Sequence, residues 1–424
     1  MIKFLFKGLM RDRHRSFLPA IVTALGVFLT VVFYCYITGI MGDTIEMSAR
    51  FESGHVKVMS RAYLENKNQN PIDLALLGAE DIITELEEMN PDMAWAERIR
   101  FGGLLDIPDE NGDTKSQGTA MGMGVDLLSE NTMEVERLNI LQAIKTGTMP
   151  SKPGEILISN QFAEKLEVNI GDDATLISSN MDGGMAFYNF TIVGTFAFGT
   201  NALDKGMIIA DIEDVRMALG MYDATAEILG FFPSGYYESE LAEEITNTYN
   251  LSKEIDPDRF APVMVTLKEE NSMGQILDLA DAMGFFMVFL FIVAMSIVLW
   301  NAGLIGGLRR YGEFGLRLAI GEAKGHVYKT QIMESVLVGL IGSVVGTIFG
   351  LLLSYWMQEH GINVESFMKT SSMMMPNVFK SRITPTAFWI GFIPGLFSSV
   401  LGTMLSGIGI YKRSTAKLFK ELEH

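Results

Sequence analysis

Residues 17–42 read FLPAIVTALGVFLTVVFYCYITGIMG, a run of 26 residues without a single charged side chain. A helix needs about 20 predominantly apolar residues to cross the hydrocarbon core of a bilayer. Three further runs of similar length and composition follow it: Gly284–Gly307, Ile332–Trp356 and Thr386–Ile410. Runs this long and this free of charge are not typical of core helices in globular proteins. The chain is therefore predicted to cross a membrane four times.

Lysine and arginine gather in three segments beside these runs, which indicates the orientation of the chain. The segments hold Lys3, Lys7, Arg11, Arg13 and Arg15; Arg309, Arg310, Arg317, Lys324 and Lys329; and Lys412, Arg413, Lys417 and Lys420. Such residues are retained on the cytoplasmic side, so both termini are predicted to be cytoplasmic. The first run is longer than the apolar part of a secretory signal, which favours an uncleaved anchor.

Residues 43–281 form an acidic segment with 43 acidic and 16 basic side chains, a net charge of −27 in a chain of net charge −18. A nucleic-acid-binding domain would need a basic patch there, and the composition excludes one. The only cysteine, Cys35, lies in the first run, and the acidic segment has one histidine, His55. Without a nucleophile–base pair or a metal-ligand cluster, we predict no catalytic residue and no metal site. The many carboxylates are interpreted as a solvated face.

The acidic segment is predicted to fold as an extracytoplasmic α/β domain. Strand-like runs alternate with short helical ones, which favours a ferredoxin-like βαβ unit with an inserted β-rich lobe near residues 90–200. Asn111-Gly112 between Ala94–Ile107 and Thr114–Val125 predicts a hairpin. Residues Glu269–Asp281 are predicted to form a helix that continues into the second span. The fold class is thus an α-helical membrane protein with an inserted α/β domain.

Residues 308–331 form a basic segment with helical spacing between the second and third spans. Arg310 and Glu313 are three residues apart, and Gly315 and Gly321 are expected to interrupt the helix. Two alternatives remain open from the residues themselves. The segment is either a solvated loop at the membrane surface or a short amphipathic element that docks into a partner.

The third span carries glycines at 339, 342, 346 and 350, largely on one face. The spacing of Gly342, Gly346 and Gly350 allows close approach of another helix. That helix could belong to the same chain or to a second subunit. Gly339 is assigned to the same packing face. Glu334 is costly to bury in lipid, and it is predicted to reach the interface or to pair with a nearby arginine.

At this point the sequence resembles the FtsX/MacB-type (type VII) ABC permeases. The resemblance is carried by RRYGEFGLRLAIGEA at 309–323, followed by Glu334 and the glycines of the third span. A second, less specific match is the extracytoplasmic pattern from Pro153-Gly154-Glu155-Ile156 through Gly171-Asp172 to Val193-Gly194. The resemblance covers essentially the whole chain. Its layout is most similar to that of the lipoprotein-releasing permeases, which have four spans and a periplasmic MacB-like core domain.

The resemblance implies a non-catalytic permease subunit in the bacterial inner membrane. Such subunits are dimeric, here with a second copy or a paralogue, and a separate cytosolic ATPase binds ATP and Mg²⁺. No cofactor is expected on this chain, which contains no G-x-x-x-x-G-K-[ST] phosphate loop. ATP hydrolysis is transmitted to the periplasmic domain (mechanotransmission), which moves on a client. The residues that match the ATPase-docking coupling helix are Arg310, Glu313, Gly315, Arg317, Gly321 and Ala323.

The preferred function is lipoprotein release from the inner membrane, with efflux by a MacB-like permease and regulation of a periplasmic cell-wall hydrolase as alternatives. The sequence does not identify the client. The predicted organisation alternates cytoplasmic segments, spans and exterior segments. It runs 1–16 cytoplasmic, 17–42 span, 43–281 periplasmic, 284–307 span, 308–331 cytoplasmic, 332–356 span, 357–385 exterior loop, 386–410 span and 411–424 cytoplasmic.

Overall fold

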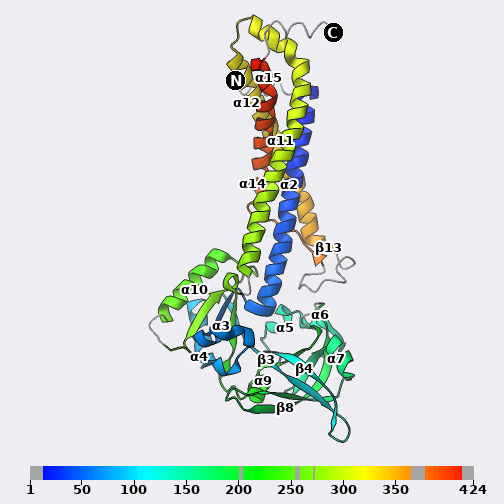
Figure 1. Ribbon diagram of the computed structural model, residues 1–424, viewed down its shortest axis with the longest axis vertical. Coiled ribbons are helices and arrows are strands. Elements are labelled where there is room, and N and C mark those ends of the chain that lie inside the picture. Colours follow the sequence, from blue (N-terminus) through cyan, green and yellow to red (C-terminus); the bar gives the residue numbers. More distant parts are fainter. Residues whose placement is uncertain (1–12, 200–203, 254–257, 271–272, 364–377, 413–424) are drawn as a thin grey trace. The chain divides into compact units, whose positions relative to one another are not determined.

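The computed structural model describes residues 13–199, 204–253, 258–270, 273–363 and 378–412. The chain divides into two compact units (Figure 1). The helical unit comprises Met1–Met41, Leu277–Val364 and Val378–His424. The α/β unit comprises Gly42–Ile276 and Glu365–Asn377. The cluster Met373-Met374-Met375 and the basic residues before Arg13 and after Lys412 lie outside the described residues.

The helical unit is built from long helices that run side by side (Figure 1). They are α2 (Arg13–Ser48), α11 (Met273–Ala319), α12 (Lys324–His360), the short α14 (Ala387–Ile390) and α15 (Phe392–Lys412), with a small strand pair β13 (Ile362–Asn363) and β14 (Val378–Phe379). Within the described residues, four segments are long and apolar enough to span a membrane: Phe17–Ser53, Met273–Asn301, Lys324–His360 and Ala387–Ile408. The prediction of four spans is confirmed.

The helices differ from the prediction at two places, one at a glycine and one at a proline. Gly315 does not interrupt a helix, because α11 continues through it to Ala319; a single glycine inside a helix costs only ~1 kcal/mol. The fourth span is not one helix, since α14 ends at Ile390 and α15 begins at Phe392. Pro394 has no amide hydrogen for the carbonyl of Ile390, so the helical ladder is broken there.

The α/β unit contains the expected ferredoxin-like motif. Its elements are β1 (Val56–Ser60), α4 (Ala79–Met89), the first part of β3 (Ala94–Pro108), β11 (Glu227–Phe231), α10 (Ser239–Lys253) and β12 (Pro262–Thr266). The strand order is β12-β1-β11-β3, with every neighbouring pair antiparallel. This is the order of a split βαβ fold whose second and third strands are separated in sequence by an insertion.

The insertion is the predicted β-rich lobe. It holds the rest of β3, then β4 (Thr114–Val125), α5 (Glu134–Arg137), α6 (Ile140–Ala143), β5 (Ile144–Gly147), β6 (Glu155–Ser159), α7 (Asn160–Leu166), β7 (Asp173–Ser179), β8 (Met185–Phe196), β9 (Met207–Asp211) and α9 (Ile212–Leu219). The hairpin of β3 and β4 is confirmed, with Ile99 opposite Gly124 and Pro108 opposite Thr114. The two strands are continuous with the ferredoxin-like sheet because β3 belongs to both.

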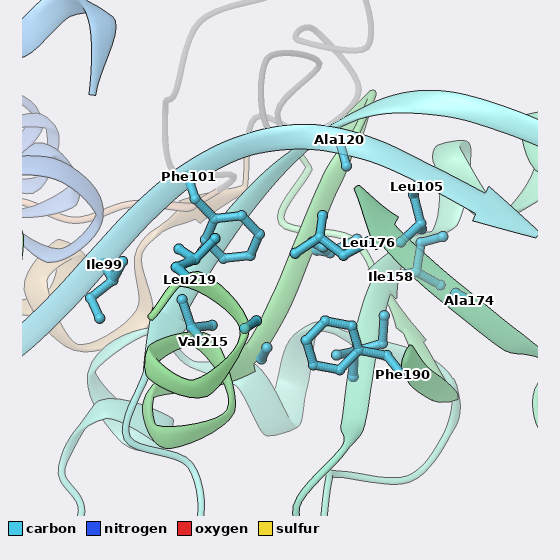
Figure 2. Close-up of a cluster of buried hydrophobic side chains, with 14 of the residues drawn as sticks. Ile99, Phe101, Leu105, Ala120, Ile158, Ala174, Leu176, Phe190, Val215 and Leu219 are labelled. Atoms are coloured by element: carbon cyan, nitrogen blue, oxygen red, sulfur yellow. The ribbon is translucent and has the colours of Figure 1, made fainter. Parts of the chain in front are cut away.

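The expected end of the lobe near residue 200 is too early. Side chains of β9 and α9 pack into the same hydrophobic core as those of β3 and β7. Figure 2 shows this core, in which Val215 and Leu219 of α9 lie beside Ile99 and Phe101. Burying each such side chain contributes roughly 1.5–3 kcal/mol, so β9 and α9 are held in the lobe. The lobe therefore extends to the strand β10 (Ala224–Thr225), which pairs with β2 (Leu76–Leu77).

Candidate functional site

The turn between α11 and α12 is the part of the molecule that the family resemblance singles out. Gly321 has φ +100°, a left-handed conformation that favours glycine. Its amide donates to the carbonyl of Leu318 (3.1 Å), and the amide of Glu322 donates to the carbonyl of Arg317 (3.0 Å). These two bonds form a Schellman motif, which ends a helix. The structure thus has a tight connection of two long helices in place of a separate short helix.

The predicted coupling residues lie on both sides of this turn. Arg317 is half-buried on the last turn of α11, and Gly321 and Ala323 are exposed. The backbones of Arg310, Glu313 and Gly315 belong to α11, whereas their side chains lie outside the described residues. The part that these six residues play in coupling stays a prediction.

Two apolar side chains at the turn are exposed, which the spacing of this segment does not predict. Leu316 is 57% exposed and Ile320 is 78% exposed. They are four residues apart, so they lie one helical turn from each other. An apolar pair at i and i+4 beside a basic segment indicates a docking surface. The predicted coupling residues came from the arginine and glycine motif and did not include this pair.

Three glycines of α12 lie directly against α2. A Cβ added at Gly346 would lie 2.4 Å from the carbonyl oxygen of Ala24. One added at Gly342 or Gly350 would lie 2.7 Å from Cβ of Thr23 or 2.9 Å from Cβ of Val31. These contacts place the close-packing face inside the chain, between the first and third spans, and so favour the intramolecular alternative.

The fourth glycine of the predicted set has a different neighbour. A Cβ added at Gly339 would lie 3.1 Å from the hydroxyl of Ser399 and 3.2 Å from the carbonyl of Gly395, both on α15. The hydroxyls of Thr23 and Ser399 are 3.2 Å apart and join α2 to α15. Because Gly339 and Gly342 are three residues apart, α12 presents them to two different helices. Small residues thus line both of its contacts.

Glu334, predicted as an intramembrane charge, is half-buried on α12. Nearby on the same helix, the hydroxyl of Tyr328 donates to the carbonyl of Met404 on α15 (3.2 Å). Polar groups therefore lie on this part of α12, although the pairing of Glu334 with an arginine stays a prediction.

In the α/β unit, His55 makes structural hydrogen bonds. It is 1% exposed, and its Nε2 lies 3.2 Å from both carboxylate oxygens of Glu46. Its Nδ1 accepts a hydrogen bond from the amide of Phe232 (2.9 Å), so Nε2 carries the proton and donates to Glu46. Glu46 also accepts from the amide of Tyr237 (2.8 Å). No group of His, Cys, Asp or Glu that could hold a metal ion occurs among the described residues.

The interpretation of the carboxylates as a solvated face is wrong for a buried subset, which includes Glu134, Glu227 and Glu270. Nε of Arg98, a side chain with no exposed surface, donates to Glu134 (2.8 Å), and Arg137 also pairs with this carboxylate. Burial acts to raise the pKa of Glu134, but the two arginines outweigh it and hold the pKa below its ordinary value. Arg137 is only three residues from Glu134, but Arg98 is 36 residues from it, so no local pattern marks the buried pair.

Residues 285–415 match the model of the family described as FtsX-like permease C-terminal. The chain is similar to the lipoprotein-releasing system transmembrane protein LolC of Xylella fastidiosa, with 26% identity over 228 residues, 51% of this chain and 52% of that protein. It is also similar to LolC of Haemophilus influenzae, with 22% identity over 262 residues, 60% of this chain and 61% of that protein. The matched region spans about half the length of the Xylella relative.

Among solved structures, the chain is similar to the periplasmic region of MacB from Actinobacillus actinomycetemcomitans. The TM-score is 0.35 at 11% identity, over 53% of this chain and 92% of that one. The fold of the α/β unit is established by its own strand order. The family match covers α11, the turn after it, α12 and α15, where the sequence motif lies. The predicted resemblance is confirmed: residues 285–415 match the FtsX-like permease family, the chain is similar in sequence to LolC, and its described residues include four segments able to span a membrane.

Proposed function

We propose that the chain is the permease subunit of an ABC transporter that releases lipoproteins from the inner membrane. In this proposal a separate cytosolic ATPase binds ATP and Mg²⁺, and its hydrolysis cycle moves the α/β unit on the periplasmic side. The observation that carries the proposal is the FtsX-like match over residues 285–415 in a chain similar to LolC proteins, whose name describes a lipoprotein-releasing system. The permease works as a dimer with a second copy or a paralogue, and it has no catalytic residue of its own.

The turn after α11 is the proposed docking site for the ATPase. Exposed Leu316 and Ile320 would insert into an apolar groove of the partner. Arg317 beside them would pair with an acidic residue at the rim of that groove. The Schellman motif at Gly321 holds the end of α11 in one conformation, so a push from the partner is delivered along the helix axis. Of the two alternatives for this segment, the arrangement favours an element that docks into a partner over a solvated loop.

Charge reversal at this turn tests the coupling. We expect Glu313→Lys and Arg317→Glu to lower lipoprotein release about tenfold, a typical size for a coupling free energy. ATP hydrolysis by the complex and membrane insertion should persist, because the changes lie outside both the nucleotide site and the spans. The measurement is lipoprotein release and phosphate production by the complex in proteoliposomes. Lys329→Glu, an exposed cation on α12, is the matched control and should behave as the wild type.

Normal release by both variants would remove the turn from the coupling path. If the wild-type complex releases no lipoprotein but expels small molecules from the vesicles, the efflux alternative is the correct function.

The orientation is tested by labelling single cysteines in intact cells. In a Cys35→Ser background, Glu110→Cys in the exposed loop between β3 and β4 should react with an impermeant maleimide. Gly325→Cys at the start of α12 should react only after the membrane is opened, because Lys and Arg are retained on the cytoplasmic side. Labelling of Gly325→Cys from outside would reverse the proposed topology.

A further inference from the structure

Two short segments of the α/β unit join it to the membrane helices along the chain. The first is the π-helical turn η1 (Ala49–Ser53), which directly follows α2. The second surrounds Glu270, whose carbonyl accepts from the amide of Met273, the first residue of α11 (2.8 Å). We call these segments the first and second junctions. Side chains of the three neighbouring strands β1, β11 and β3 connect the two junctions.

The first junction is held by arginines of β3. Nη2 of Arg100 donates to the carbonyls of Phe51 (2.6 Å) and Glu52 (3.0 Å). Nη1 of Arg98 donates to the carbonyl of Arg50. The last carbonyls of a helix carry partial negative charge and lack partners within the helix. Two guanidinium groups therefore hold η1, the turn that follows α2, to the sheet.

Glu227 of β11 connects this arginine pair to the second junction. Its Oε2 lies 3.7 Å from Nε of Arg100, and its Oε1 accepts from Nζ of Lys57 on β1 (3.0 Å). Nζ of Lys57 lies in turn 3.9 Å from Oε2 of Glu270, which also pairs with Lys67 at 3.1 Å. A line of four charged side chains thus runs from one junction to the other.

Three of the four side chains in this line are buried, so their charges depend on one another. Lys57, Glu227 and Glu270 are 3%, 4% and 2% exposed. Water cannot replace a lost partner at such positions, so removing one charge leaves the next uncompensated. Burial acts to raise the pKa of Glu227, and Lys57 and Arg100 outweigh it, so the pKa lies below its ordinary value and the carboxylate is charged.

We propose that Glu227 is a positioning residue that locks both membrane junctions to one rigid block of three strands. This inference rests on the proposed function, because the block would deliver a displacement of either membrane helix to the same part of the α/β unit. Without the lock, each junction would move on its own and the sheet would receive two unrelated displacements.

The test is hydrogen exchange of the full-length protein in detergent, read at the amides of Ser53 and Gly54 for the first junction and Glu270 and Met273 for the second. We expect Glu227→Gln to speed exchange about tenfold at both junctions, the change that ~1.4 kcal/mol of local stability produces. The variant should fold, since Gln keeps the shape and Lys57 keeps Glu270 as a partner.

Two further variants make the expectation specific. Arg100→Met should speed exchange at the first junction alone, because the line from Glu227 to Glu270 stays intact. Glu85→Gln removes an ion pair with Lys253 (2.7 Å) outside this line and should alter neither junction. Release of lipoprotein per ATP hydrolysed should fall about tenfold in Glu227→Gln and stay normal in Glu85→Gln.

Faster exchange at only one junction in Glu227→Gln, or an equal rise over the whole α/β unit, would overturn the proposal. Normal release per ATP despite two loosened junctions would also overturn it, since the lock would then be structural only. If the wild-type complex itself releases no lipoprotein, the proposed function fails, and the exchange data still decide whether Glu227 joins the two segments.

Discussion

Replacing Gly346 with leucine will prevent α12 from packing against α2. A Cβ at this position meets the carbonyl oxygen of Ala24 at 2.4 Å and the Cβ of Val27 at 2.8 Å, and both belong to a helix that cannot give way locally. Overpacking a core commonly costs about 1–3 kcal/mol, and a clash with backbone lies at or above the upper end. We expect normal membrane levels, because leucine increases hydrophobicity. The thermal midpoint of the detergent-solubilised protein should fall by about 10 °C.

The matched control is Val345→Leu on the same helix. Val345 is 40% exposed and adjacent in sequence, so the same side chain is introduced on an open face. This variant should keep the wild-type midpoint. Equal midpoints for Gly346→Leu and the wild type would mean that the glycine face does not hold α2, and the intramolecular packing would have to be abandoned.

Replacing Arg98 with methionine will strongly destabilise the α/β unit. Arg98 has no exposed surface, and its loss leaves Glu134, which is 3% exposed, with Arg137 as its remaining cation and removes the donor to the carbonyl of Arg50. Removing one side of a buried ion pair costs up to about 3–5 kcal/mol, because the charge that remains stays out of water. The measurement is denaturant unfolding followed by the fluorescence of Trp95, which lies on β3 three residues before Arg98, with the other three tryptophans replaced by phenylalanine.

A second substitution separates charge from packing in this experiment. Arg98→Met combined with Glu134→Gln removes the buried carboxylate that has lost one of its two arginines, so the double variant should recover part of the lost stability. A double variant that is less stable than Arg98→Met would show that the cost does not arise from the buried charge of Glu134.

The sequence determined the local elements with good accuracy. The hairpin around Asn111-Gly112 has, to within one residue, the bounds that alternation and turn residues predict. The four spans also follow from composition, because crossing a bilayer requires a long run of apolar residues that is visible without any partner. The ferredoxin-like unit was predictable for a related reason, since alternating strands and helices leave few ways to form one sheet.

Tertiary structure alone decided which residues meet. Lys57 and Glu227 are 170 positions apart in sequence, and Thr23 and Ser399 are 376 positions apart. Local periodicity carries no information on contacts over such separations. The glycine spacing of α12 predicts that another helix approaches closely. Which helix this is depends on the arrangement around α12: it is α2 at Gly346 and α15 at Gly339. The carboxylates gave the largest error for the same reason. A glutamate has the same local pattern on a solvated face as beside a buried arginine, and only the fold supplies the arginine.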